Sequence, residues 1–397
     1  MRKLALAALA TTMLAGSVAT AAAEDIKLGV FLGFTGPIES LVANMGPGAE
    51  LAIKEVSDSG ALLDGSTVTA VRGDTTCTDA AAATAAAERL ITSDGVKALV
   101  GGDCSGVTGA ALQNVARPNG VVMISPSATS PGLTTAEDDG LFFRTAPSDA
   151  RQGQIVSDIL TGKGVKKIAL TYTNNDYGKG LSDAIAANFK AAGGEVTIVA
   201  AHEDGKGDYG AEVGALAAAG GEVLVVAGYL DQGGKGIIQG SLDSGAFDTF
   251  YLPDGMVGDA LPTAIGDDLN GSYGAAPGTD SPGAAKFAEM GKAAGFDGAS
   301  PFAGESYDAA ALIMLAMQAA GSSDSAKLKE KVFEVANAPG EKIFPGELAK
   351  ALKLIKEGKD IDYVGASAVE LIGPGESAGN YKEIEIKAQK LSTVGYR

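Results

Sequence analysis

Three small hydroxyl side chains follow two apolar segments of the chain. Ser105 comes after residues 96–100, and Ser127 and Thr129 come after residues 121–124. Both segments have the length and composition of buried strands. If these strands are neighbours in a parallel sheet, their carboxyl ends meet at the crevice where such sheets bind ligands. Ser105 also opens a helical run whose free backbone N–H groups attract anions, so the pattern predicts a carboxylate site.

Each hydroxyl residue also has an ordinary structural explanation. Ser and Thr are common helix caps and turn formers, and on a single loop that explanation is the stronger one. The coincidence of two loops expected at the same sheet edge favours ligand binding.

Three side chains in the second half of the chain stand in the same position relative to predicted strands. They are Tyr177, Tyr229 and Asp254, after predicted strands at 167–172, 223–227 and 249–252. Two tyrosines can enclose an apolar side chain, and an acid can pair with an ammonium group. A single Tyr more often packs, and Asp before Gly often forms a turn. Together with the hydroxyl loops, however, they outline a site for an α-amino acid.

The elements that must position these residues alternate between strand and helix, and the second half of the chain repeats the first. With 397 residues, the chain exceeds what one hydrophobic core usually organises. We therefore predict an α/β fold with two doubly wound lobes. One lobe is expected at 24–146 plus about 276–358, and the other at 147–275 plus about 359–397. Crossings near residues 146, 275 and 360 would form a hinge that restricts the lobes to opening and closing.

The N-terminus has the features of a secretory signal. Arg2 and Lys3 precede an apolar run at 4–15, and small residues at 21–23 provide a cleavage site. We expect cleavage after Ala23 and export to the periplasm. No later segment reaches the roughly 20 apolar residues of a membrane span.

Composition restricts the partners. Loss of Arg2 and Lys3 takes the formal net charge of −18 to −20. Such a surface repels nucleic acid and anionic lipid. One His and two Cys provide too few ligands for a zinc or iron site, and we expect no cofactor.

The two cysteines, Cys77 and Cys104, fall on loops expected at the same sheet edge. In an oxidising compartment they are expected to form a disulfide, worth about 3 kcal/mol in the chain-entropy model.

An enzyme is the rival interpretation. Residues 102–106 have the form Gly-x-nucleophile-x-Gly, with Cys104 as the nucleophile. Its only possible histidine base, His202, is predicted at a strand end in the other lobe or at the surface, and Cys104 is expected to be oxidised. The Gly-x-Gly-x-x-Gly pattern at 205–210 begins several residues beyond its strand and is interpreted as a turn.

Several short motifs occur in the order found in a known family. They are Glu24-Asp25-Ile26-Lys27, Thr35-Gly36-Pro37, Cys77 with Cys104-Ser105, Ile124 to Thr129 (ISPSAT), Tyr177-Gly178-Lys179-Gly180, Gly228-Tyr229 and Pro253-Asp254-Gly255. Over nearly the whole mature length, the chain resembles the leucine/isoleucine/valine-binding periplasmic proteins of ABC transporters. The resemblance implies a monomer that performs no catalysis and delivers an amino acid to an inner-membrane permease.

The resemblance also implies roles for individual residues. Ser105 and Thr129 would bind the ligand carboxylate. The Ser127 carbonyl, the Thr129 hydroxyl and the Asp254 carboxylate would bind the ammonium. The other expected binding residues are Ala128, Tyr177, Tyr229, Leu41 and Phe302.

The chain departs from this family in three places. Asp254 stands where Glu is usual, Ser127 stands where Ala is usual, and residues 339–368 match poorly and suggest a lobe-spanning insertion with a helix at 346–357. Another small carboxylate or amide solute, or a sensor role with the same fold, therefore remains an alternative.

Overall fold

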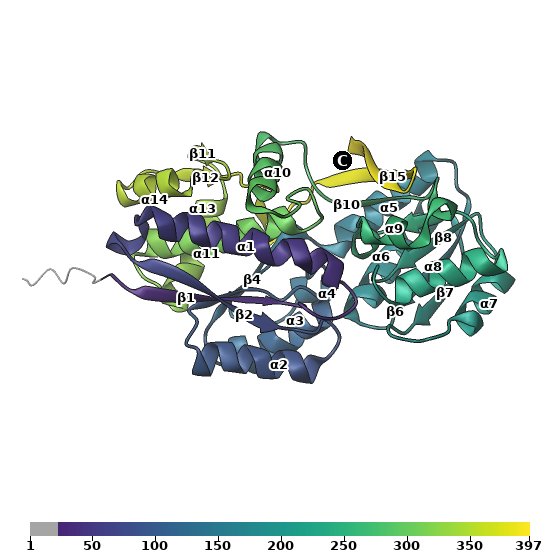
Figure 1. Ribbon diagram of the computed structural model, residues 1–397, viewed down its shortest axis with the longest axis horizontal. Helices are drawn as coiled ribbons and strands as arrows, with labels where there is room; N and C mark the ends of the chain where they lie inside the picture. The colour runs from purple at the N-terminus through teal and green to yellow at the C-terminus, as the bar shows by residue number, and fades with distance from the viewer. Residues whose placement is uncertain (1–22) are drawn as a thin grey trace, which may run out of the picture.

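Two lobes lie side by side along the longest axis of the molecule (Figure 1). The computed structural model describes residues 23–397, so nearly all of the predicted signal peptide lies outside the described residues. Each lobe contains a seven-stranded sheet with helices packed around it. The predicted α/β fold with two lobes is confirmed.

The first sheet has the strand order β13-β14-β5-β4-β3-β1-β2. Its strands are β1 (Asp25–Leu32), β2 (Thr67–Asp74), β3 (Ala98–Gly101), β4 (Val122–Ser125), β5 (Phe142–Pro147), β13 (Leu371–Ile372) and β14 (Glu376–Ser377). The strands β2-β1-β3-β4-β5 run parallel, and β3, β4 and β5 are buried along their whole length. This burial explains the mainly apolar sequences of β3 and β4.

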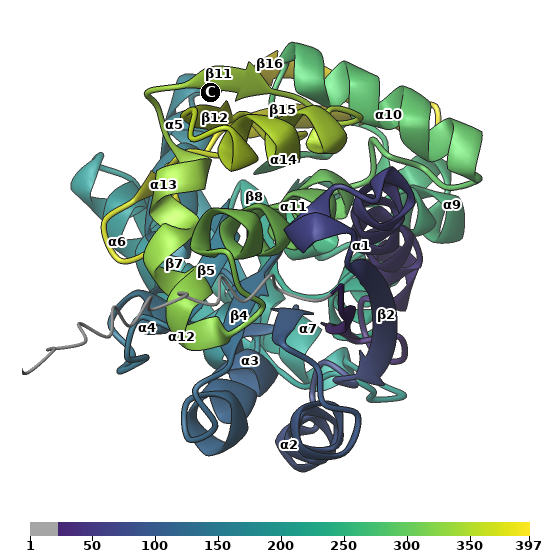
Figure 2. The ribbon, with the colours of Figure 1, turned by 90° about the vertical axis from the view of Figure 1, so that its left-hand side faces the viewer.

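Helices cover both faces of the first sheet. Helices α1 (Glu39–Ser59) and α11 (Ala303–Ala320) pack together on one face, and α2 (Ala80–Glu88) and α3 (Ser105–Ala111) lie on the other (Figures 1 and 2). Almost every side chain of α11 is buried, since it lies between the sheet and further helices. Helix α3 packs beside α2 in the first lobe and also contacts α6 (Asp176–Ala191) of the second lobe.

The second sheet has the order β16-β15-β10-β9-β8-β6-β7. Its strands are β6 (Lys167–Thr173), β7 (Glu195–His202), β8 (Val223–Ala227), β9 (Phe250–Leu252), β10 (Tyr273–Pro277), β15 (Tyr381–Lys387) and β16 (Lys390–Tyr396), and its main helices are α5 (Asp149–Gly162), α6 (Asp176–Ala191), α7 (Gly210–Ala219) and α8 (Gly233–Ser244). Strands β6 to β10 are parallel, as predicted. The C-terminal hairpin β15–β16 adds two antiparallel strands at one edge.

The chain passes between the sheets three times. The crossings follow β5, β10 and β14 and lead into α5, α10 (Pro282–Ala294) and β15. The third crossing was expected near residue 360, but β13 and β14 still pair within the first sheet, so it lies after Ser377. These strands are two residues long, too short for their side-chain alternation to be recognised.

Residues 341–363 form a separate layer on the first lobe. They contain β11 (Glu341–Ile343), α14 (Leu348–Lys356) and β12 (Ile361–Tyr363), and α14 packs on the outside of α1 and α11 (Figures 1 and 2). The predicted helix is present, but the segment does not span the lobes. Asp308 of α11 holds the C-terminal end of this segment. Its carboxylate accepts hydrogen bonds from the Tyr363 hydroxyl (2.8 Å), the Ala366 N–H (2.8 Å) and Ser367.

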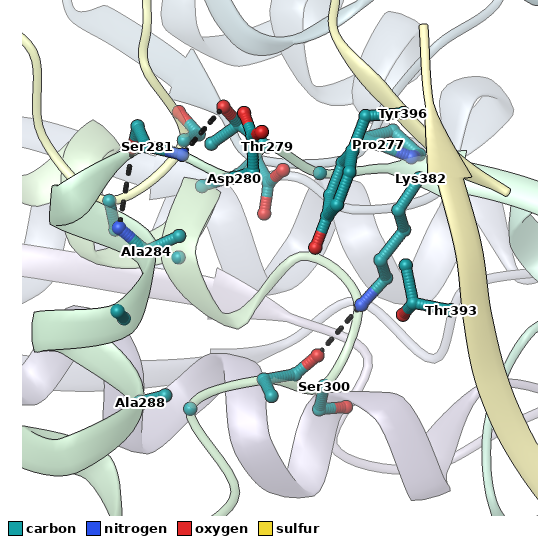
Figure 3. Close-up of a pocket in the computed structure, with 18 residues that line it drawn as sticks. Pro277, Thr279, Asp280, Ser281, Ala284, Ala288, Ser300, Lys382, Thr393 and Tyr396 are labelled. Atoms are coloured by element: carbon teal, nitrogen blue, oxygen red, sulfur yellow. Dashed lines mark hydrogen bonds between the residues drawn. The ribbon is translucent and has the colours of Figure 1, made fainter. Parts of the chain in front are cut away.

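A groove of about 410 Å³ lies at the hinge (Figure 3). Its walls include the second crossing and the start of α11. Lys382 of β15 reaches across it and donates a hydrogen bond to the Ala299 carbonyl (2.8 Å), which joins the lobes. Glu305, in the first turn of α11, is 6% exposed, and burial raises the pKa of its carboxyl to about 7.

The hydrogen bonds of Asp308 predict that substitution of this residue lowers stability, whereas substitution of a nearby acid does not. Asp308→Ala leaves several buried donors without an acceptor and should lower the free energy of unfolding by about 2–4 kcal/mol in denaturant titrations. Asp362→Ala, in β12 of the same segment, should change it little, because no hydrogen bond of the Asp362 side chain is found among the described residues. Equal losses in the two variants would contradict the anchoring role.

Glu305 predicts a pH-dependent stability. Its pKa rises from 4.5 to about 7 on folding, so the folded protein holds this proton more tightly than the unfolded chain. Stability should therefore decline as the pH rises from about 4.5 to about 7, by up to about 3 kcal/mol. Glu305→Gln should flatten this part of the melting-temperature profile, whereas the exposed Glu289→Gln should not. Identical profiles for wild type and Glu305→Gln would refute the assignment.

Candidate functional site

A small cavity lies at the seam between the lobes. It has a volume of about 20 Å³ and is lined by residues of both lobes: Ile38, Leu41, Asp103, Cys104, Ser105, Ser127 and Phe302 from the first, and Tyr177, Tyr229, Asp254 and Gly255 from the second. Seven of the nine expected binding residues are therefore neighbours here. A cavity of this volume admits about one water molecule, so an amino acid requires the lobes or the tyrosine rings to move.

The first lobe contributes two loops that are hydrogen-bonded to each other. The Ser127 hydroxyl donates to the Asp103 carbonyl (3.1 Å), and the Ser105 hydroxyl accepts from the Ser130 N–H (3.1 Å). The Ser125 hydroxyl donates to the Gly102 carbonyl and accepts from the Ala128 N–H. The loops after β3 and β4 therefore form one unit.

Two expected binding residues lie behind the cavity wall. Ala128 and Thr129 are fully buried and do not line the cavity. The Ala128 N–H and carbonyl are both taken by protein partners, and the Thr129 carbonyl accepts from the Asp149 N–H (2.8 Å). This arrangement places neither residue in contact with the cavity, so their direct contacts with a ligand stay a prediction.

Arg144 of β5 organises this loop, although the sequence analysis did not single it out. Its side chain is 1% exposed and donates to the carbonyls of Ala128 (3.0 Å) and Ser130 (2.9 Å). It also pairs with Glu376 of β14 (2.5 Å). One buried guanidinium thus fixes the serine loop and joins β5 to the strand before the third crossing. The sequence signal was an arginine within an apolar strand.

The second lobe contributes an aromatic pair and an acid. Tyr177 and Tyr229 are stacked, with ring centroids 5.2 Å apart and planes at 12°. The Tyr177 hydroxyl donates to the Asp254 carboxyl (2.6 Å) and accepts from the Gly255 N–H (3.2 Å). Asp254 is 1% exposed, and burial raises its pKa, although the bonds from Tyr177 and Gln152 oppose that shift.

A second acid, Asp149, stands at the start of α5 behind Asp254. Its side chain is fully buried, and burial together with the charge of Asp254 raises its pKa well above the usual value. The Gln152 side chain bonds to both residues, donating to the Asp149 carboxyl (3.2 Å) and accepting from the Asp254 N–H (3.2 Å). The sequence analysis missed Asp149, because Asp after Ser at a helix start resembles an ordinary first-turn acid.

The predicted disulfide is confirmed. Cys77 and Cys104 are bonded, with Cα atoms 5.1 Å apart. Asp103 beside it accepts from the Gly33 N–H (2.6 Å) and the Thr75 hydroxyl (2.8 Å). The disulfide and these bonds together hold the start of α3 against β1 and β2.

The alternative interpretation as an enzyme requires a free Cys104 thiol with a histidine base beside it. Cys104 has no free thiol because it is in the disulfide. His202 ends β7 as predicted, but it is buried rather than at the surface, and burial lowers its pKa to about 4. Its ring bonds to the Thr171 hydroxyl (2.8 Å). Residues 205–210 form the connection from β7 to α7, which suits a turn.

Within residues 23–397, no group of His, Cys, Asp and Glu side chains is arranged to hold a metal ion. No helix in that range combines the length and apolar character needed to cross a membrane.

Curated proteins resemble this chain over most of its length. The Leu/Ile/Val-binding protein homolog 1 of Brucella melitensis is 32% identical over 316 residues, which are 78% of this chain and 82% of that protein. Homolog 3 of the same organism is 33% identical over 187 residues, so the match spans about half (48%) of that relative.

Solved structures share the fold. The branched-chain amino acid transporter substrate-binding protein LivJ of Streptococcus pneumoniae, in complex with isoleucine, has a TM-score of 0.78 at 22% identity, covering 94% of this chain and 99% of that chain. A solute-binding protein of an ABC transporter from R. palustris, in complex with benzoate, has a TM-score of 0.75 at 22% identity, covering 94% and 96%.

Residues 25–344 match the family model described as periplasmic binding protein. Together with the relatives, this match confirms the resemblance found in the sequence. The chain therefore belongs to the periplasmic binding protein family.

Proposed function

We propose that this protein is the solute-binding component of an ABC importer and that it captures a branched-chain amino acid between its lobes. The observation that carries the proposal is the shared cavity, where the hydroxyl loops of one lobe face the buried Asp254 of the other. The relatives named for binding leucine, isoleucine and valine support the choice of solute.

The hydrogen bonds of the two serines assign them complementary roles. The Ser105 hydroxyl accepts from the Ser130 N–H, so its own proton is free to donate to a ligand carboxylate. The Ser127 hydroxyl has already donated to the Asp103 carbonyl, so it can accept from a ligand ammonium. Ser127 therefore supplements the shorter Asp254 at the positive end of the ligand.

The apolar part of the cavity would receive the ligand side chain. Leu41 and Phe302 line it from the first lobe, opposite the stacked rings of Tyr177 and Tyr229. We propose that Tyr177 gives up its bond to Asp254 when an ammonium replaces it, which exchanges a neutral donor for a charged one.

Closure would come from contacts between the lobes outside the cavity. The Asp231 carboxylate accepts from the Ser40 N–H (2.9 Å), and the Asp231 N–H donates to the Pro37 carbonyl (3.1 Å). These bonds lie near Tyr229 and Leu41 in sequence, so closing the lobes also brings cavity residues together. Export with cleavage after Ala23, a monomeric state, delivery to an inner-membrane permease and the absence of catalysis complete the proposal.

An aromatic carboxylate is the second candidate ligand, because the stacked tyrosines offer a flat apolar wall. Its carboxylate could be bound by Ser105. However, such a ligand brings no cation to Asp254.

Substitution of the acid tests the proposal. In calorimetric titrations with leucine, isoleucine and valine, Asp254→Asn should weaken binding by about 100-fold or more, because the ammonium loses a charged acceptor. Asp259→Asn, an exposed acid five residues later, should leave the affinity unchanged although it alters the net charge equally. Wild-type binding of benzoate with no binding of these amino acids, or full affinity of Asp254→Asn, would contradict the proposal.

A further inference from the structure

Two buried carboxyl groups lie together at the back of the cleft. Asp149 and Asp254 are 0% and 1% exposed, and the Gln152 amide is hydrogen-bonded to the carboxyl of the first and the backbone N–H of the second. They come from different elements, α5 and the turn after β9. Only Asp254 lines the cavity, so Asp149 stands behind it.

Neither carboxyl forms a salt bridge with a basic side chain of the described residues. Among residues 23–397, one oxygen of Asp149 (Oδ2) has no hydrogen-bond partner. The nearby Arg144 is already used by the carbonyls of Ala128 and Ser130, the Thr134 hydroxyl and Glu376. The guanidinium therefore forms its ion pair with Glu376, and its charge only partly offsets the raised pKa of Asp149.

The other titratable groups around the pair are Asp103, which lines the cavity from the first lobe and whose pKa burial raises, and several tyrosines, which burial keeps neutral by raising their pKa. They come from α6, the loop after β8, β9 and β15: Tyr177, Tyr229, Tyr251 and Tyr381. The charge of Arg151 of α5 slightly opposes the raised pKa of Tyr381. None of these tyrosines supplies a positive charge.

Ionising both carboxyl groups of a buried pair has a high free-energy cost. Each loses its hydration, and each repels the other across the same amide. Such a pair titrates as a unit and retains one proton in the pH range where a single exposed carboxyl is fully ionised. Burial raises the pKa of both carboxyl groups, and the charge of Asp254 raises the pKa of Asp149 further, against the opposing effects of the Thr129 hydroxyl and the Arg144 charge.

We propose that Asp149 and Asp254 share one proton in the ligand-free protein and that the ammonium group of the ligand expels it on binding. One carboxyl O–H bond breaks, the proton passes to the buffer, and the ammonium takes over its charge. This inference rests on the proposed function and narrows it to ligands that carry an ammonium group. Asp149 acts as a positioning residue for charge, since it raises the affinity of Asp254 for any cation.

The experiment is calorimetric titration of the full mature chain with leucine, in two buffers of different ionisation enthalpy. At pH 7 we expect about one proton to be released per leucine bound. The dissociation constant should fall by up to about tenfold for each pH unit over the range in which the pair holds its shared proton. Benzoate, if it binds, should release none.

Two matched variants locate the proton. Asp149→Asn should remove most of the release and flatten the pH dependence, because Asp254 then ionises alone. Glu305, whose pKa is also raised to about 7, is the alternative source of the released proton. Glu305→Gln should nevertheless retain both the proton release and the pH dependence. Release that persists in Asp149→Asn and disappears in Glu305→Gln would overturn the proposal.

Infrared difference spectroscopy of the wild-type protein gives the same test if Asp149→Asn does not fold. Leucine should remove the carbonyl-stretch band of a protonated carboxyl group, and an unchanged band would overturn the proposal. Leucine binding without proton release rejects only this inference. Failure to bind any α-amino acid rejects the proposed function as well.

Discussion

Negative charge buried at the seam between the lobes constrains the rest of the site. Asp254 and Asp149 lie together, and neither forms a salt bridge within residues 23–397, while Arg144 holds the serine loop and pairs with Glu376. Burying a carboxylate is costly unless it is paired or protonated. The cleft therefore favours a positively charged group at this point, and its opposite wall offers hydroxyl and backbone donors suited to an anion.

The fold makes this arrangement possible by separating the two kinds of polar group. The hydroxyl loops follow strands of the first sheet, and the acids and tyrosines belong to the second lobe, so the halves of the site meet only when the lobes approach. The three crossings limit the motion that brings them together. Lys382 joins the two lobes at the hinge, whereas Arg144 joins β5 to β14 within the first lobe.

The sequence was sufficient for features that follow from periodicity and strand ends. The buried parallel strands, the disulfide and the positions of Ser105, Tyr177 and Asp254 beside one cavity belong to this group. Asp149 and Arg144 were missed because their importance depends on tertiary neighbours. The hairpin β15–β16 was missed because its turn, Ala388-Gln389, has positive φ angles without the Asn or Gly that usually marks such turns. Thr129 lies behind the cavity wall in this structure, and its contact with the ligand stays a prediction, since sequence gives the loop but not its depth.

The most direct test of the bipolar site compares leucine with 4-methylpentanoate, which is the same molecule without the amino group. Both fit the same apolar space and both carry a carboxylate, so the difference in affinity isolates the ammonium. We predict that the dissociation constant of 4-methylpentanoate at neutral pH is higher by about 100-fold or more, because it leaves Asp254 without a charged partner. Equal affinities would show that the buried acids do not bind the ligand, and would contradict the account.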